Sequence, residues 1–152
     1  PEFSTLFSTL FWPSVQAEDV AYWIHDQKGI TYTSTSFHAT LRDWARIGLH
    51  IMDERRTPTA DCYNRFVEKA STTQIPNQSK SFGDDLWIGR SFQGYGYQIW
   101  TENFEDPSGT FYLNGYRGQR IAINPQRQQM MVVFSVEENY MDKLYQLFAS
   151  WK

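Results

Sequence analysis

The segment from Gly94 to Ser135 decides the fold, and it reads GYGYQIW at residues 94–100, GTFYLNGYRGQRIAINP at residues 109–125 and QRQQMMVVFS at residues 126–135. Apolar and aromatic runs typical of strands alternate here with turn residues. Tyr95, Tyr97 and Ile99 would share one face of a first strand, and residues 119–124 alternate in the same way. The nearly continuous apolar run Met130–Phe134 is typical of a strand that is covered on both faces.

Turn signals separate these strands at Pro107–Gly109, at Gly115–Gly118 and at Asn124-Pro125. We therefore expect an antiparallel meander of three to four strands with one face against helices. Because helical patterns lie on both sides of this segment, the sequence predicts an α+β fold in which an antiparallel sheet is packed with helices.

Four segments have the apolar spacing of helices: residues 3–12 ended by Pro13, residues 40–53 capped by Thr40, a helix opened by Thr57-Pro58, and a last helix capped by Asn139. Asp43 should return the capping bond of Thr40, and Trp44 should be buried between its helix and the sheet. The expected inner faces are Leu41, Trp44, Ala45, Gly48 and Met52; Tyr63, Phe66, Val67 and Ala70; and Met141, Leu144, Tyr145, Phe148 and Trp151. We also expect a short hairpin at residues 23–32 and a return of Leu86–Ile88 to the core.

Composition and charge exclude several classes of protein. The 152 residues are 41% hydrophobic and 20% charged, which suits one globular domain better than a disordered chain. A net charge of −3 gives no basic footprint for nucleic acid, and no run of about 18 apolar residues predicts a membrane span. Cys62 is the only cysteine, so no intrachain disulfide can form and the compartment stays open. The three histidines lack metal-binding spacing, so we expect neither a metal nor a cofactor.

Two other patterns resemble functional sites. His25 and Asp26 would point to opposite faces of an extended segment, so they would not act together as a base and its orienting group. Acids beside aromatic rings suit a sugar or cation site, and this set comprises Asp84, Asp85, Glu102, Glu105 and Asp106 with Trp87, Phe92, Tyr95, Tyr97 and Trp100. Because 17% of the chain is aromatic, we expect most of these rings in the core.

Four blocks resemble the serine β-lactamase-like hydrolases, a superfamily that includes penicillin-binding proteins, class C β-lactamases, related esterases and nylon-oligomer hydrolases. The blocks are AEDVAYWIHDQKGI at residues 17–30, HATLRDWARIGLHIMD at residues 38–53, GYGYQIW at residues 94–100 and NGYRGQRIAINPQRQQMMVVFS at residues 114–135. Their order and separation also fit, and the Arg42-Asp43 pair is a fold signature of the family. The resemblance covers nearly the whole chain but only the last part of the family's domain. It implies a single partial domain over residues 1–152 without the N-terminal catalytic part.

The family hydrolyses esters, amides or β-lactams through an acyl-serine, which it forms with a serine and a lysine in the motif S-x-x-K. No S-x-x-K occurs in these 152 residues. Tyr112-Leu113-Asn114 spells the second motif, Y-x-N, but it falls in the strand of the third motif, of which only Gly115 is kept. The resemblance therefore implies a C-terminal fragment or truncated homologue of a hydrolase, inactive by itself.

The turn after that strand is the part of the family's site that this chain retains. In the family this edge supplies a backbone donor to the oxyanion hole. The candidate binding residues are thus Gly115, Arg117, Gly118 and Gln119, and Arg117 could bind a carboxylate. The alternative is a tight hairpin with a solvated arginine, and no catalytic residue is predicted.

Two further functions stay open: an independent binding or assembly module on the same fold, and a stand-alone hydrolase with another site. A partial domain would leave a strand edge and apolar surface uncovered. We therefore expect a homo-oligomer, either a homodimer with contacts near Tyr95–Trp100 or Met130–Phe134 or an exchange of the N-terminal helix between chains.

Overall fold

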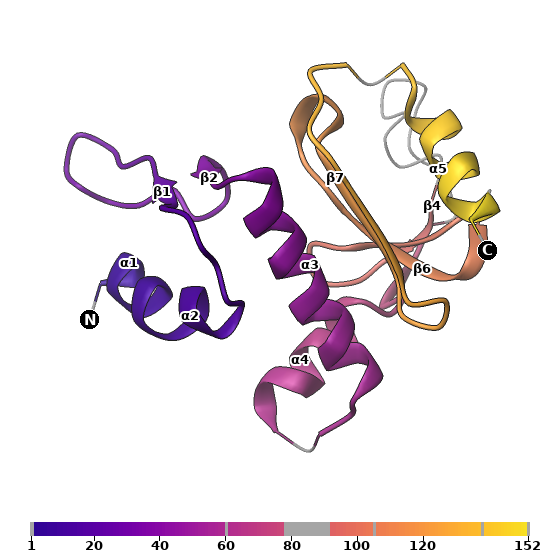
Figure 1. The fold of residues 1–152 in the computed structure, drawn as a ribbon, viewed down its shortest axis with the longest axis horizontal. Helices are drawn as coiled ribbons and strands as arrows, with labels where there is room; N and C mark the ends of the chain where they lie inside the picture. The colour runs from indigo at the N-terminus through magenta and orange to yellow at the C-terminus, as the bar shows by residue number, and fades with distance from the viewer. Residues whose placement is uncertain (1, 60, 78–91, 105, 138, 152) are drawn as a thin grey trace. The chain divides into compact units, whose positions relative to one another are not determined.

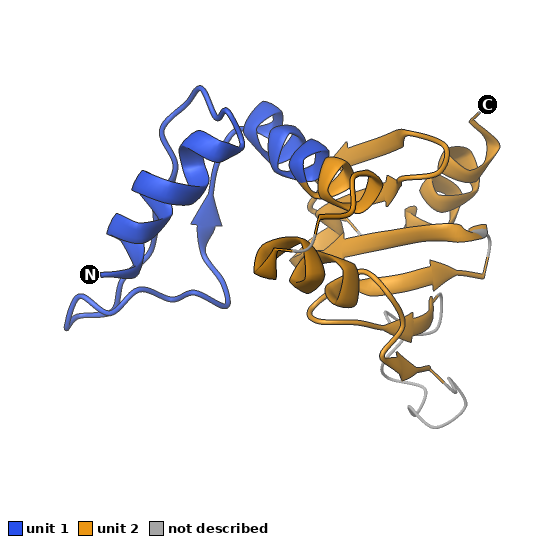
Figure 2. Cartoon of the chain, turned by 90° about the horizontal axis from the view of Figure 1, so that it is seen from below, with its two compact units in different colours: residues 1–50 blue, residues 51–152 orange. Residues whose placement is uncertain are grey.

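The computed structural model describes residues 2–59, 61–77, 92–104, 106–137 and 139–151. The chain forms two compact units, Pro1–His50 and Ile51–Lys152, which Figure 2 shows in blue and orange. The single domain over residues 1–152 stays a prediction. The expected return of Leu86–Ile88 to the core lies outside the described residues.

The first unit begins with a helical stretch made of α1 (Phe3–Leu6), η1 (Phe7–Phe11) and α2 (Trp12–Ser14). η1 is a π-helix, in which the N–H of Trp12 donates to the carbonyl of Phe7, five residues back. A proline inside a helix lacks an N–H and crowds the preceding turn, and a wider turn relieves that crowding. The prediction that Pro13 ends the helix is therefore wrong, because the chain continues through it to Ser14.

Aromatic rings pack together in the first unit. Phe7 lies edge-on against Trp23 and Phe37, with ring centroids 5.6 and 5.1 Å apart. Trp23 and Phe37 are paired across a two-stranded sheet of β1 (Tyr22–Trp23) and β2 (Phe37–His38). The predicted hairpin at residues 23–32 is present as an antiparallel bridge between His25 and Thr31.

α3 (Leu41–Arg56) begins at the predicted cap. The hydroxyl of Thr40 accepts the Asp43 N–H at 3.2 Å and donates to the Asp43 carboxylate at 3.0 Å. The carboxylate also accepts the N–H groups of Glu18 and Asp19 at 3.0 and 3.1 Å and the Arg46 guanidinium at 2.9 Å. Burial alone would raise the pKa of Asp43, but these donors outweigh it and lower the pKa. Asp43 is fully buried and ties residues 18–19 to the start of α3, which is the structural role that the sequence assigned to it.

α4 (Cys62–Ala70) starts later than predicted. α3 extends to Arg56, and the carboxylate of Asp61 caps α4 by accepting the Asn64 N–H at 2.8 Å. Thr57-Pro58 therefore lies in the connection, and the prediction that Pro58 opens the helix is wrong.

The inner faces of α3 and α4 differ in part from the prediction. Trp44 is half-buried against Phe37 of the same unit, at 5.2 Å between ring centroids, so it is less buried than the predicted position between its helix and the sheet requires. The residues that are buried are Ile47, Gly48, Met52, Asn64, Val67 and Ala70, while Leu41, Tyr63 and Phe66 are exposed. A polar residue takes an inner position of α4 because the Asn64 amide donates to the carbonyl of Glu54 at 2.6 Å.

The second unit contains a six-stranded antiparallel sheet in the order β3-β4-β5-β6-β7-β8 (Figure 1). The strands are β3 (Ile75–Pro76), β4 (Phe92–Tyr95), β5 (Trp100–Asn103), β6 (Asp106–Asn114), β7 (Arg120–Asn124) and β8 (Gln129–Val133). The α+β class and the antiparallel meander are confirmed, although three to four strands was too few. Among the described residues, β3 and β8 are the outer strands of this sheet.

The strands at the start of this sheet were placed wrongly. Residues 94–100 are not one strand, because the N–H of Gly96 donates to the carbonyl of Ile99 at 2.8 Å and closes a hairpin between β4 and β5. Pro107–Gly109 is not a turn but part of β6. Thr101, Asn103 and Asp106 are 2%, 0% and 3% exposed. Because these strands bury polar residues, the sequence shows no apolar alternation here that would predict them. The turns at Gly115–Gly118 and Asn124-Pro125 are confirmed.

Gly96 is required by close packing. A Cβ at this position would lie 1.9 Å from the carbonyl oxygen of Ala70, the last residue of α4. The next N–H, that of Tyr97, donates to the same oxygen at 3.1 Å. A glycine at this point therefore lets the end of α4 rest directly on the β4–β5 hairpin.

α5 (Met141–Ser150) covers the sheet (Figure 1). Met141, Tyr145 and Phe148 of its predicted stripe are buried in one cluster with Phe92, Tyr112, Ala122 and Met131 of the strands. Tyr140, not Asn139, is the N-cap, and Trp151 is 41% exposed. Only Met131 of β8 is buried, and the other residues of the strand are half-buried. The prediction that Met130–Phe134 is covered on both faces is therefore only partly met. Within the described residues, no helix has the length and apolar character that a membrane span needs.

Candidate functional site: the turn between β6 and β7

The turn that connects β6 to β7 holds all four predicted binding residues. The N–H of Gly115 donates to the carbonyl of Gln119 at 2.7 Å, which closes the turn. Between them, Tyr116–Gly118 form the short helix η3. Arg117 and Gly118 have positive φ angles of 56° and 84°. A positive φ is costly for a residue such as arginine, so the turn is held in this shape by its surroundings.

Arg120, the first residue of β7, holds the turn from beneath. Its side chain donates through Nη1 to the carbonyl oxygens of Gly115 and Gln119, the latter at 2.8 Å. Its Nε donates to the hydroxyl of Tyr145 on α5 at 3.2 Å. Arg120 is 5% exposed. This buried cation therefore fixes both ends of the turn and links it to α5.

Tyr145 is a neutral partner in this arrangement. Burial raises the pKa of its phenol, and the nearby charge and hydrogen bond of Arg120 oppose that shift only in part. Its hydroxyl thus stays protonated at neutral pH and accepts from Arg120. The sequence analysis missed Arg120 as an anchor, and the available signal was a charged residue within the alternating strand 119–124.

The four predicted residues have different roles in the structure. Gly115, Arg117 and Gln119 are exposed, whereas Gly118 is buried. A Cβ at Gly118 would lie 2.2 Å from the carbonyl oxygen of Glu137, so this glycine is required by both packing and its positive φ. The exposed side of the turn therefore offers Arg117, Gln119 and backbone groups to a ligand. Among the described residues, none forms an ion pair with Arg117.

A serine lies next to the turn but is not activated. The Cβ of Ser135 would be 3.2 Å from a Cβ at Gly118. The Ser135 hydroxyl donates to the carbonyl of Glu137 at 2.8 Å and accepts the N–H of the same residue at 2.9 Å. A serine nucleophile needs a base at its hydroxyl, and a carbonyl cannot take the proton. Tyr112 of the Y-x-N sequence is 0% exposed, and burial raises the pKa of its phenol, so it is a core residue.

The other sequence patterns can be followed only where the structure describes their residues. Asp26 accepts the N–H groups of Lys28 and Ile30, both at 2.8 Å, while Nδ1 of His25 lies 3.2 Å from the carbonyl of Gly29, so the two side chains act separately. Of the proposed sugar or cation set, Asp84, Asp85, Trp87 and Glu105 lie outside the described residues. The ring of Trp100 stacks on Phe92 and meets Tyr95 edge-on in the sheet. No cluster of metal-ligating side chains occurs in the described part of the chain.

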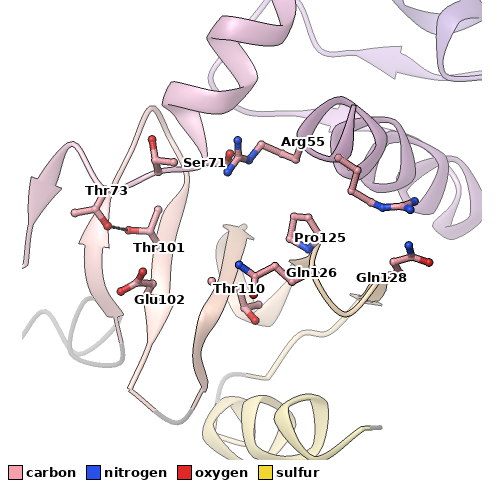
Figure 3. A pocket seen from close by; sticks show the side chains of 12 residues that line it. Arg55, Ser71, Thr73, Thr101, Glu102, Thr110, Pro125, Gln126 and Gln128 are labelled. Atoms are coloured by element: carbon pink, nitrogen blue, oxygen red, sulfur yellow. Dashed lines mark hydrogen bonds between the residues drawn. The ribbon is translucent and has the colours of Figure 1, made fainter. Parts of the chain in front are cut away.

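A cavity of about 580 Å³ lies at the opposite end of β7 (Figure 3). Its lining comes from the last turn of α3, the segment after α4, β5, β6 and the β7–β8 turn, and comprises Arg55, Arg56, Ser71, Thr72, Thr73, Thr101, Glu102, Gly109, Thr110, Pro125, Gln126 and Gln128. β7 begins at Arg120 under the candidate turn and ends at Asn124 beside Pro125. A strand rises about 3.4 Å per residue, so the cavity and the turn are separated by roughly 14 Å.

Comparison of the sequence with protein-family models finds no match, and a search of curated proteins finds none either.

Proposed function

We propose that this chain is the C-terminal part of a serine β-lactamase-like hydrolase and that the Gly115–Gln119 turn is its contribution to an acyl-serine site. The observation that carries the proposal is the turn itself. It is exposed at Gly115, Arg117 and Gln119 and is fixed from beneath by the buried side chain of Arg120. Backbone donors aimed at a developing oxyanion act best when they are held rigidly before the reaction.

In this proposal the turn binds and the nucleophile comes from elsewhere. Backbone N–H groups of the turn face the acyl oxygen, and Arg117 binds a carboxylate of the substrate through its planar fork. The fold signature Asp43 supports the same assignment, because a buried carboxylate with four donors is a costly feature that serves the fold. The 152 residues contain no S-x-x-K, so the chain by itself does not form an acyl-serine.

Assays of the isolated chain test this inactivity. A chromogenic cephalosporin and a p-nitrophenyl ester should show no turnover above a heat-denatured control. Turnover that a serine-directed phosphonate abolishes would contradict the proposal and favour a stand-alone hydrolase. A Ser135→Ala variant, which removes the serine beside the turn, is the matched control for any residual rate.

The reading frame upstream of the codon for Pro1 tests the assignment to the family. The proposal expects an in-frame S-x-x-K followed by a Y-x-N before Pro1. The joined chain should then hydrolyse the ester, and Arg117→Met should raise KM for a carboxylate-bearing substrate more than for a neutral one. A stop codon directly upstream would contradict the assignment to the family and favour the alternative function, an assembly module.

The alternative is an assembly module that pairs through its sheet edge. β8 is an edge strand, and next to it Phe134 and Val136 are 50% and 76% exposed. An edge strand beside exposed apolar residues is a surface on which a second copy can pair. Residues 95–100 are not such an edge, because β4 and β5 are each paired on both sides. Of the two outer strands, β3 has two residues and β8 has five beside exposed Phe134 and Val136, so a homodimer would form through β8.

A further inference from the structure

The geometry points to a second binding site, the cavity at the Asn124 end of β7, which takes a short zwitterion of the amino-acid or peptide type. In this assignment Arg55 binds the carboxylate of the ligand, and Glu102 binds its ammonium group. Figure 3 shows the two side chains on different walls, Arg55 on α3 and Glu102 on β5. The site is independent of the candidate turn and of the function proposed for it.

Arg55 is the anion-binding group. It is half-buried, and its Nε is buried with no hydrogen-bond partner in the part of the chain that the structure describes. Its guanidinium forms no ion pair there either. A buried donor that lacks a partner is costly, and an arginine fork fits a carboxylate with two parallel bonds. Because Arg55 also lines the cavity, a carboxylate bound there would provide the missing partner.

Glu102 lines the cavity at an irregularity in β5. The pairing of β5 with β6 shifts register between Thr101 and Asn103, and Glu102 between them has a φ of 52°. A bulge of this kind re-aims one side chain of a strand. Glu102 lines the cavity and is half-buried, and no described residue forms an ion pair with it.

The floor of the cavity consists of hydroxyl groups whose positions are fixed. Thr101 and Thr110 are 2% and 0% exposed. The Thr101 hydroxyl is bonded to that of Thr73 at 2.6 Å, and the Thr110 hydroxyl donates to Asp106 at 2.6 Å. Ser71 donates its hydroxyl proton to the carbonyl of Val67 at 2.8 Å. The Thr110 oxygen already accepts the Asn124 amide at 2.8 Å, whereas the Ser71 oxygen keeps lone pairs that suit an N–H group of a ligand.

The charges and shape of the lining select among ligands. Arg56 also lines the cavity, but its guanidinium lies 3.9 Å from the Asp53 carboxylate and its side chain is 40% exposed. A doubly charged phosphate would be attracted to the arginines but repelled by Glu102, whereas a zwitterion satisfies both Arg55 and Glu102. Among the described residues that line the cavity none is aromatic, so they offer no stacking surface of the kind that sugars use. A compact space of about 580 Å³ is about 10 Å across, which accommodates a ligand of two to three extended residues.

Calorimetric titration of the 152-residue chain with glycylglycine tests the site. We expect saturable binding, and we expect binding at least tenfold weaker for glycylglycinamide, which lacks the carboxylate, and for N-acetylglycylglycine, which lacks the ammonium group. Inorganic phosphate should also bind at least tenfold more weakly than glycylglycine. Equal binding of the dipeptide and its two blocked forms, tighter binding of phosphate, or no binding of glycylglycine at 50 mM would overturn the assignment.

Variants assign the two ends of the ligand. Arg55→Met should weaken the binding of glycylglycine at least tenfold and leave the binding of glycylglycinamide unchanged. Glu102→Gln should also weaken the binding of glycylglycine at least tenfold, and it should leave the binding of N-acetylglycylglycine unchanged. Arg42→Met and Glu68→Gln change exposed charges outside the cavity and should bind like the parent chain. Arg55→Lys keeps the charge and the fold, so it should bind glycylglycine at least as tightly as Arg55→Met does. Parent-like binding by Arg55→Met would contradict the role of Arg55. Weaker binding by Arg55→Lys than by Arg55→Met would contradict it as well.

Discussion

Replacement of Asp106 by asparagine should destabilise the second unit by about 3 kcal/mol. The Asp106 carboxylate is 3% exposed and accepts the hydroxyls of Ser108 and Thr110 at 2.5 and 2.6 Å. It also forms a two-pronged pair with Arg127, at 2.7 Å to Nη2 and 3.3 Å to Nη1. Asparagine keeps the shape but places an N–H₂ group against these donors and leaves the arginine without its counter-charge.

The magnitude follows from the surroundings of Arg127. Removal of one partner of a buried ion pair costs about 3–5 kcal/mol. The lower end applies here because the Arg127 side chain is 25% exposed and retains Phe148, whose ring centroid lies 5.4 Å from the guanidinium carbon. With a urea m-value near 2 kcal/mol per M, the unfolding midpoint should fall by about 1.5 M.

Urea unfolding followed by circular dichroism measures the loss, and a double-mutant cycle identifies its cause. If an uncompensated cation causes the loss, Asp106→Asn combined with Arg127→Met should be less destabilised than the sum of the two single variants, by about 2 kcal/mol. Strict additivity, or a loss below about 1 kcal/mol for Asp106→Asn, would refute the reasoning.

The stability lost in Asp106→Asn should also depend on pH. Burial alone would raise the pKa of Asp106, but Ser108, Thr110 and Arg127 outweigh it and lower the pKa. A carboxyl with a lowered pKa stabilises the folded state at any pH above its unfolded pKa of about 3.9, and this contribution disappears as the pH falls through the folded pKa. The stability difference between parent and Asp106→Asn should therefore be constant above about pH 5 and shrink below pH 4. A difference that grows on acidification would show that Asp106 is not held as the carboxylate.

Two further changes test the packing and the assembly. Gly96→Ala should cost about 3 kcal/mol in urea unfolding, because its Cβ would lie 1.9 Å from the backbone oxygen of Ala70. The control Gly115→Ala should cost less than about 1 kcal/mol, since its Cβ would meet the Gln119 side chain at 3.1 Å, and equal losses would contradict the close approach at Gly96. In sedimentation equilibrium at micromolar concentration, the chain should behave as a dimer that Phe134→Glu dissociates. A monomer mass that does not depend on concentration would exclude pairing through β8.

The sequence by itself determined the elements that carry a strong local signal. The stripe of α5, with Met141, Tyr145 and Phe148 buried, follows from helical periodicity. The cap of α3 at Thr40 follows from local hydrogen-bond chemistry, and the turn at Gly115–Gly118 from glycine spacing. In each of these cases the partners are close in sequence or the periodicity extends over the whole element, so the pattern indicates the structure directly.

The tertiary structure alone decided where polar residues are buried. Thr101 and Asp106 look like loop residues in the sequence, but Thr73, 28 residues before Thr101, and Arg127, 21 residues after Asp106, bond to them inside the sheet. Arg120 likewise becomes the anchor of the candidate turn only because Tyr145 reaches it from α5. Arg55 and Glu102 share a cavity because α3 and a bulge in β5 meet there. The cost of burying a polar group depends on partners that are distant in the chain, and local patterns do not contain that information.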